Sequence, residues 1–416
     1  MKNSIRRLDS SSLSIPHFYG GEGLFFVSYS VFLLYMIFCT SFYLIYIDNL
    51  WKPVFVMCIG LLAVYELVKE KVSWKNVLII SVICLLIINI IRITGGREQL
   101  SIACLLLYMY SARDISFRKI ARITMAISIF ALAVIVLSAY IGIIPNYIAA
   151  GDRKREYLGF LYALYSSTLL SNITLLWVYL KKEKMTFLGT VLWGGVNLFF
   201  FIKTNSRLCF CLTILMLVIG LLLKKGRGFL WRRKLICCVM VFSFNIVAIL
   251  SYWITKKYNS LIGWQYRLNK ALGSRLSLGQ ESLRQIGISW FGIKGIKWVG
   301  NGLNKYGETS KEAYLFVDNY YIQVMQRFGL VFLILTLIVL TYAAYKAYRC
   351  KDMYLLCIFS LLAVHFMVDN LYMYMQYNAF WILVGIIIFS KRNRVSLSIN
   401  SYRNSKTKYT ECNELL

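Results

Sequence analysis

Long runs of apolar residues, separated by short basic loops, dominate this chain of 416 residues. Each run is long enough, or nearly so, to cross about 30 Å of hydrocarbon as an α-helix. The runs cover residues 24–47, 77–91, 123–144, 186–202, 208–223, 235–254, 328–343 and 376–390. Because 59% of the residues are hydrophobic, an ordinary soluble globular domain is excluded. The sequence therefore predicts an all-α polytopic integral membrane protein.

Lysines and arginines collect on every second loop, as the positive-inside rule requires if the N-terminus is cytoplasmic. We predict about twelve transmembrane helices with both termini cytoplasmic, or ten or eleven if a short one is re-entrant. Residues 1–393 then form a single transmembrane domain, and residues 394–416 form a polar cytoplasmic tail. The predicted spans are 24–47, 54–68, 77–94, 98–111, 120–144, 158–180, 185–203, 207–223, 235–254, 318–345, 353–368 and 375–390.

The net charge of +29 would suggest nucleic acid as the partner of a soluble protein. Here the basic residues lie in short loops where the topology already demands them, so no nucleic acid partner is expected. No set of histidines, cysteines and carboxylates has the spacing of a metal site, and neither a metal nor another cofactor is expected. All eleven cysteines fall in predicted spans or cytoplasmic segments, which predicts that there are no disulfides.

The one long connection, residues 255–317, is placed outside the membrane by this topology. It carries ten Lys and Arg residues against three Glu residues, which runs against the positive-inside rule. Leu268, Leu272 and Leu276 recur every four residues, and this spacing predicts an amphipathic helix at the membrane surface. Loops of this length are usually functional. Arg275 and Arg284 are its candidate binding residues.

Two further basic groups are expected on the outer face. Arg153, Lys154 and Arg155 precede the sixth predicted span, at a helix start that favours anions over cations. Arg207 follows a very short turn and must lie at the interface, where an unpaired cation is costly. A bound phosphate would explain both groups, because arginine forks across two phosphate oxygens. A solvated loop at 151–156 and a snorkelling anchor at Arg207 are the alternatives.

Acids are scarce on the predicted outer face, so each of them is a candidate base. Asp318 and Asn319 open the tenth predicted span, where an acid and an amide could deprotonate and orient a hydroxyl. A helix start fixes Asp318, which makes it the preferred base, although simple capping is the alternative. Glu312 and His365 are the secondary candidates. His365 and Asp369 are one helical turn apart, a spacing that is also typical of a polar pair between helices.

A largely cationic pocket at an outer membrane face suits an anionic lipid headgroup, in particular a diphosphate. Arginines can stabilise a departing diphosphate without Mg²⁺. A transported small anion would instead favour charges near the midplane on broken helices, and the sequence has no matching pair of Gly- or Pro-broken spans.

Four motifs, in order, resemble those of the Wzy-type O-antigen and capsular polysaccharide polymerases, which belong with the O-antigen ligases in one superfamily. The resemblance covers about residues 150–370. After Phe160, the chain has Leu161-Tyr162-Ala163 where a His-Pro-Asn is common in the family. The motifs are Arg153-x-Arg155-x-x-Leu158-Gly159-Phe160, Thr204-Asn205-Ser206-Arg207, Arg275-Leu276-Ser277-Leu278 followed by Trp290-Phe291-Gly292, and Val317-Asp318-Asn319-x-Tyr321 ahead of Phe328-Gly329.

The resemblance implies a metal-independent, inverting glycosyltransferase of the bacterial cytoplasmic membrane. Such an enzyme joins undecaprenyl-diphosphate-linked oligosaccharide repeat units at the outer face, for a capsule, O-antigen or exopolysaccharide. Its partners would be the lipid-linked donor and acceptor, membrane lipid, and the flippase and chain-length regulator of the same pathway. The diphosphate-binding arginines carry over onto Arg153, Arg155, Arg207, Arg275 and Arg284. The alternatives are a glycan ligase that uses the same donor and a flippase or exporter of lipid-linked oligosaccharide.

Overall fold

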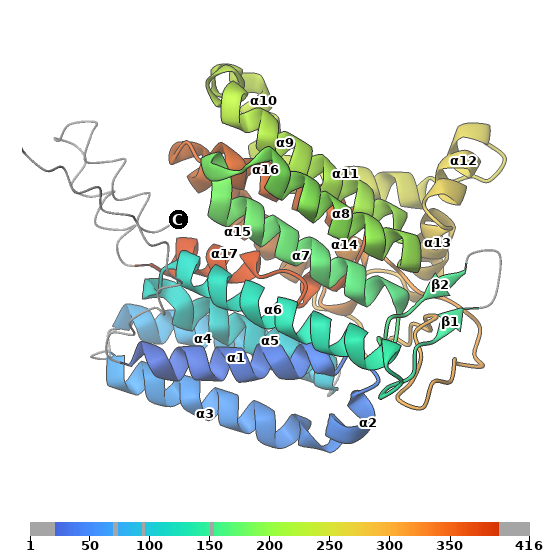
Figure 1. The fold of residues 1–416 in the computed structure, drawn as a ribbon, viewed down its shortest axis with the longest axis horizontal. Helices are drawn as coiled ribbons and strands as arrows, with labels where there is room; N and C mark the ends of the chain where they lie inside the picture. The colour runs from blue at the N-terminus through green and yellow to red at the C-terminus, as the bar shows by residue number, and fades with distance from the viewer. Residues whose placement is uncertain (1–20, 70–73, 94–95, 150–153, 391–416) are drawn as a thin grey trace, which may run out of the picture.

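The computed structural model describes residues 21–69, 74–93, 96–149 and 154–390, and it is a bundle of α-helices (Figure 1). The longer helices are α1 (Glu22–Phe38), α3 (Trp51–Lys69), α4 (Trp74–Ile93), α5 (Arg97–Ser111), α6 (Phe117–Tyr140), α7 (Ala163–Lys181), α8 (Phe187–Thr204), α9 (Arg207–Arg232), α11 (Ser243–Lys256), α15 (Leu330–Arg349) and α16 (Met353–Val368). The shorter elements are α2 (Leu44–Ile47), α10 (Lys234–Val241), α12 (Gly263–Ala271), α13 (Arg275–Ile286), α14 (Tyr320–Arg327), α17 (Phe380–Phe389), the strands β1 (Ile148–Ala149) and β2 (Arg155–Glu156), and the 3-10 turns η1 (Asp48–Leu50), η2 (Ala112–Asp114), η3 (Lys182–Lys184) and η4 (Leu371–Met373).

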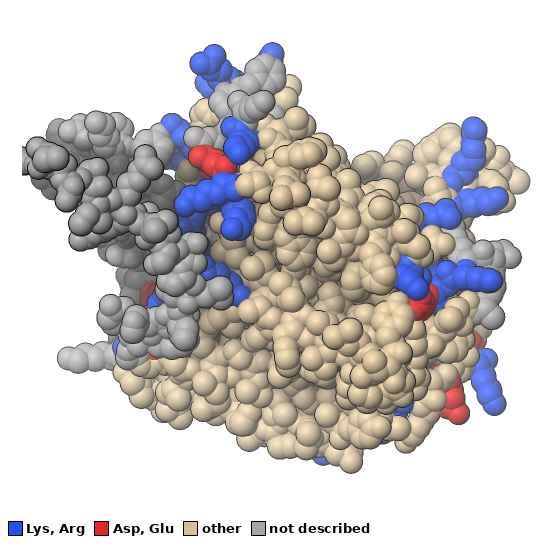
Figure 2. Space-filling view, in the orientation of Figure 1, with Lys and Arg blue, Asp and Glu red and all other residues tan. Residues whose placement is uncertain are grey.

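Within the described residues, seven helices are long and apolar enough to cross a membrane. The number rises to eight if α10 and α11, which are bent by 62° at Phe242, count as one broken span. In Figure 2, Lys and Arg side chains gather toward two ends of the molecule, and a belt almost free of charge lies between them. The prediction of an all-α multi-pass membrane protein is thus confirmed, whereas the count of twelve spans stays a prediction.

Helix α7 lies at the centre of the bundle, where it contacts α6, α8, α9 and α16. It is buried along almost its whole length, and several of its buried side chains are polar. These polar groups are paired with other helices: Ser167 with Thr204 (2.8 Å), and Thr213 with Ser171 (2.8 Å). Buried hydroxyls that find partners in this way hold neighbouring helices in a fixed register in an apolar surrounding.

Three predicted spans are not continuous helices. The first predicted span, 24–47, ends as helix at Phe38. After it, residues 40–42 pair with residues 159–161: the Phe42 amide donates to the Gly159 carbonyl, and the Leu161 amide donates to the Thr40 carbonyl. The tenth, 318–345, is divided into α14 and α15 at Gly329, whose φ of 98° no helix can continue. The twelfth, 375–390, begins as helix only at Phe380; the segment before it is a buried loop whose backbone bonds Asn172.

Ion pairs join the connecting segments at each of the two ends of the bundle. At one end, Lys119 pairs with Glu22 at 2.8 Å, and Lys182 pairs with Asp352. At the other end, Asp48 lies between Arg97 (3.0 Å) and Lys305 (2.7 Å), while Lys203 pairs with Glu156 (2.9 Å). Which end faces the cytoplasm stays a prediction.

The long loop is partly helical, as predicted, but its helix is not continuous. The structure has two helices, α12 and α13, because Gly273 and Ser274 both take a φ of 67° and break the predicted run through Leu272. After α13, the backbone of Gly292 packs directly on that of residues 327–329. The expectation that there are no disulfides is wrong for Cys350, which is disulfide-bonded. The nine other described cysteines are free.

Candidate functional site

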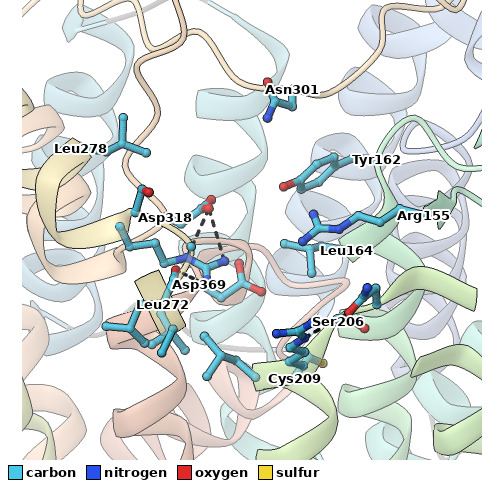
Figure 3. A pocket seen from close by; sticks show the side chains of 18 of the residues that line it. Arg155, Tyr162, Leu164, Ser206, Cys209, Leu272, Leu278, Asn301, Asp318 and Asp369 are labelled. Atoms are coloured by element: carbon cyan, nitrogen blue, oxygen red, sulfur yellow. Dashed lines mark hydrogen bonds and ion pairs between the residues drawn. The ribbon is translucent and has the colours of Figure 1, made fainter. Parts of the chain in front are cut away.

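A cavity of about 380 Å³ opens at the end of the bundle that carries α12, α13 and the two short strands. Five separate stretches of chain line it: the segment from β2 to α7, the turn between α8 and α9, the turn between α12 and α13, the loop before α14, and the end of α16. Figure 3 shows Arg155 and Tyr162 reaching in from the side opposite Asp318 and Asp369. Residues that are more than 200 positions apart in the sequence thus share one polar chamber.

Arg275 and Asp318 form an ion pair in the wall of this cavity. Nε and Nη2 of Arg275 both lie 3.3 Å from Oδ2 of Asp318. Both side chains are largely buried, with exposed fractions of 17% and 14%. Burial raises the pKa of Asp318, and the neighbouring Arg275 acts in the opposite direction. Asp318 therefore has a fixed cationic partner before any ligand arrives.

Asp318 does not cap the helix that follows it. The cap of α14 is Asn319, whose side chain accepts a hydrogen bond from the Ile322 amide at 3.2 Å. The Asn319 amide group also donates to Ser251 at 2.7 Å. The capping alternative for Asp318 is therefore wrong, and the Asn319 side chain is occupied by structural bonds.

Arg155 and Arg207 line the same cavity, and neither forms an ion pair with a carboxylate of the described residues. Nε of Arg155 is buried and has no hydrogen-bond partner there. Nε of Arg207 donates only to the neutral amide oxygen of Asn205, at 3.2 Å. Glu156, the neighbour of Arg155 in the sequence, pairs with Lys203. Two guanidinium groups are thus available to an anion.

Asp369 is the second carboxylate of the cavity, and it is only 4% exposed. Its Oδ1 accepts from the Leu371 amide (2.9 Å), and its Oδ2 accepts from the Thr168 hydroxyl (3.2 Å). Burial raises the pKa of Asp369 to about 7, although both hydrogen bonds favour its ionised form. The side chains of His365 and Asp369 do not form the polar pair that was expected; the two residues are joined only by the backbone hydrogen bond from the Asp369 amide to the His365 carbonyl. The His365 ring packs against Tyr372 instead, with 4.1 Å between the ring centroids and 39° between the ring planes.

Four of the predicted site residues do not line the cavity or lie outside the described residues. Asn319, the cap of α14, is one of them. Arg284 is on α13 but outside the cavity, with 74% of its side chain exposed and a pair to Glu281 at 2.6 Å. Glu312 is exposed in the loop before α14 and does not line the cavity. Arg153 lies outside the described residues. The structure therefore brings together Arg155, Arg207, Arg275, Asp318 and His365.

Sequence reasoning did not assign a role to two tyrosines of the cavity, Tyr162 and Tyr314. Burial raises the pKa of Tyr314 to about 12, so its hydroxyl stays protonated and can donate. Tyr162 occupies one of the positions where the sequence departs from the Wzy-type pattern, and that departure was the only available signal. Among the described residues, no group of three or more histidines, cysteines or acids could hold a metal ion.

Three arginines against two carboxylates give the cavity an excess of positive charge. Since burial favours the neutral form of Asp369, the positive excess is largest when that carboxyl is protonated. A scan of protein-family models and searches of curated proteins and of solved structures found no match to this chain.

Proposed function

We propose that this protein is a polysaccharide polymerase that joins undecaprenyl-diphosphate-linked repeat units at the outer face of the bacterial cytoplasmic membrane. One observation carries the proposal. Arg155, Arg207 and Arg275 come from three separate segments at one end of an apolar helical bundle and line a single cavity. A lipid diphosphate can reach such a place from the bilayer, and arginines bind diphosphate oxygens through paired, charge-assisted hydrogen bonds.

The proposed reaction is an inverting glycosyl transfer. The hydroxyl oxygen of the acceptor glycan attacks the anomeric carbon of the donor as the bond to the lipid diphosphate breaks. The electron pair of that bond leaves with the diphosphate, so negative charge grows there in the transition state. Arg155 and Arg207, without carboxylate partners among the described residues, are suited to stabilise that charge. Arg275, held by Asp318, provides a third positive charge at a fixed position.

The participants follow from this reaction. The donor and acceptor are both lipid-linked oligosaccharides, and the membrane itself delivers them. A flippase would supply them to the outer face, and a chain-length regulator would act on the product. The arginines at the site would balance the negative charge of the leaving diphosphate without a metal ion.

The test is a gel of lipid-linked glycans from cells with and without this protein. Loss of a polymerase should leave one repeat unit on each lipid, and expression should restore a ladder of lengths. A ligase would restore transfer to another acceptor with no change in the ladder. If the protein were a flippase, its loss would leave the lipid-linked substrate on the inner face, where an external glycosidase could not reach it. Either of these two results would overturn the polymerase proposal.

A further inference from the structure

We propose that Asp369, rather than Asp318, is the catalytic base of this site and accepts the proton of the attacking hydroxyl. This inference rests on the proposed function. In the same step, the hydroxyl oxygen bonds to the anomeric carbon, and the lipid diphosphate leaves with the electron pair. The proton ends on the Asp369 carboxyl, and later passes to water.

The first support is the difference in partners between the two carboxylates. Both line the cavity, but Asp318 is held by the Arg275 guanidinium, whereas Asp369 is held only by the neutral Thr168 hydroxyl and Leu371 amide. A fixed cation lowers the proton affinity of a carboxylate. A carboxylate held by neutral donors keeps both a fixed orientation and the ability to take up a proton.

The second support is the position of Asp369 in the fold. It follows the last residue of α16 and is buried against α7 through Thr168. The loop behind it is tied to α7 as well, since Asn172 bonds the backbone of Gln376 and of Ala379. The carboxylate is therefore tied to α7, whereas Glu312 lies in the glycine-bearing loop before α14.

The ionisable surroundings of Asp369 are favourable to a base that works near neutral pH. The Asp318 carboxylate raises its pKa, while the Arg275 guanidinium lowers it. The other titratable groups around it come from α7, α9, α16 and the loop before α17: Tyr165, Cys209, His365, Tyr372 and Tyr377. The tyrosines and the cysteine are neutral when protonated, and the imidazole of His365 is neutral when unprotonated.

His365 is the main rival, because it also lines the cavity and is 3% exposed. Proton uptake would leave a buried imidazolium near Arg275, whereas proton uptake by Asp369 leaves a neutral carboxyl. A buried site holds the neutral product at lower cost. The geometry therefore favours the carboxylate.

The experiment measures polymerisation by the purified full-length protein, with a synthetic lipid-linked repeat unit, between pH 5.5 and 9. The wild-type rate should rise as the pH passes about 7 and then level off, because the ionised carboxylate is the active form. Asp369→Asn should lower the plateau by about a hundredfold or more and remove the rise, since general-base catalysis contributes at least that much. Donor binding by this variant, measured in the same detergent, should stay within about threefold of the wild type and shows that it is folded.

Two further variants separate a base from a merely structural carboxylate. Thr168→Val removes a hydrogen bond that favours the ionised form, so the midpoint of the pH profile should move up by as much as about one unit. Asp318→Asn should lower the rate but keep a rising profile, with a midpoint at lower pH, because a neighbouring negative charge is gone.

The inference is overturned if Asp369→Asn binds donor normally and keeps the rising profile within tenfold of the wild-type rate. It is equally overturned if Asp318→Asn, and not Asp369→Asn, flattens the profile. In both cases the proposed function survives. If the wild-type protein makes no polymer at any pH although it binds the donor, the proposed function itself fails.

Discussion

Arg275 and Asp318, 43 residues apart in the sequence, form a largely buried ion pair that joins the start of α13 to the segment just before α14. The pair closes one wall of the cavity and couples the long loop to the helical bundle. A pair of this kind adds little net stability, but removal of one partner leaves a buried charge behind.

That relationship predicts a strong coupling between the two positions. Arg275→Met should lower the free energy of unfolding by about 3 kcal/mol, because it leaves the Asp318 carboxylate without its cation. The double variant Arg275→Met/Asp318→Asn should recover most of that loss and still be inactive. Thermal unfolding of the wild type, the two single variants and the double variant in detergent gives the coupling energy. Strictly additive effects would show that the two side chains do not interact.

The cavity also predicts which arginines matter for polymerisation. Arg155→Ala and Arg207→Ala should each reduce activity by about tenfold or more, since a charge-assisted contact contributes roughly 1.5–3 kcal/mol. Lysine should substitute poorly, because it lacks the planar fork of the guanidinium. The measurement is the chain-length distribution and rate at equal protein levels.

Two other cations of the long loop serve as comparisons for that series. Arg267→Ala removes an exposed cation of α12 that does not line the cavity, and the ladder should be unchanged. Arg284→Ala should cost less than about twofold, because its guanidinium is exposed and pairs with Glu281. Equal losses at Arg267 and Arg155 would mean that general surface charge, and not the cavity, attracts the substrate.

The fold class followed directly from hydropathy, because a long apolar run can only be stable as a helix across hydrocarbon. The helix breaks did not follow. The bonds between residues 40–42 and 159–161 depend on a partner more than a hundred positions away, and no local pattern announces it.

The candidate site was most predictable for its cations. Arg155, Arg207 and Arg275 stand out in a sequence because they are costly at an outer membrane face. The acids have no such signal. Asp318 was preferred for its place near a helix start, and only the structure shows that its neighbour Asn319 is the cap. The suitability of Asp369 as a base depends on its burial against Thr168, which lies 201 residues away in the sequence.

Gly329 divides α14 from α15, and its backbone conformation suits glycine alone. It has a φ of 98°, and a Cβ atom there would lie 2.3 Å from the carbonyl oxygen of Trp290. Gly329→Ala should therefore destabilise the protein by about 1–3 kcal/mol from backbone strain alone, with more from the clash. The thermal midpoint in detergent measures this. Gly263→Ala, which has open space and no positive φ, is the matched control and should be nearly neutral.

The predicted topology places the loop before α14 outside the membrane and the turn at η3 inside. In a cysteine-free background, a cysteine at the exposed position Ser310 should react with a membrane-impermeant maleimide in intact cells. A cysteine at the exposed position Lys184 should react only after permeabilisation. The reverse pattern would invert the topology and place the arginine-lined cavity on the cytoplasmic side.

The buried Asp369 carboxyl predicts how stability depends on pH, independently of any activity. Its pKa is raised to about 7 in the folded protein, against 3.8 for an ordinary aspartate. Between these values the unfolded chain releases the proton while the folded protein keeps it, so stability falls as the pH rises through this window. The full difference amounts to roughly 4 kcal/mol at most. Asp369→Asn should lose this dependence and be the more stable protein at pH 8, and the two should converge near pH 4. Thermal midpoints in detergent at these two pH values measure the difference, and parallel pH profiles for both proteins would show that Asp369 ionises as freely as it does in water.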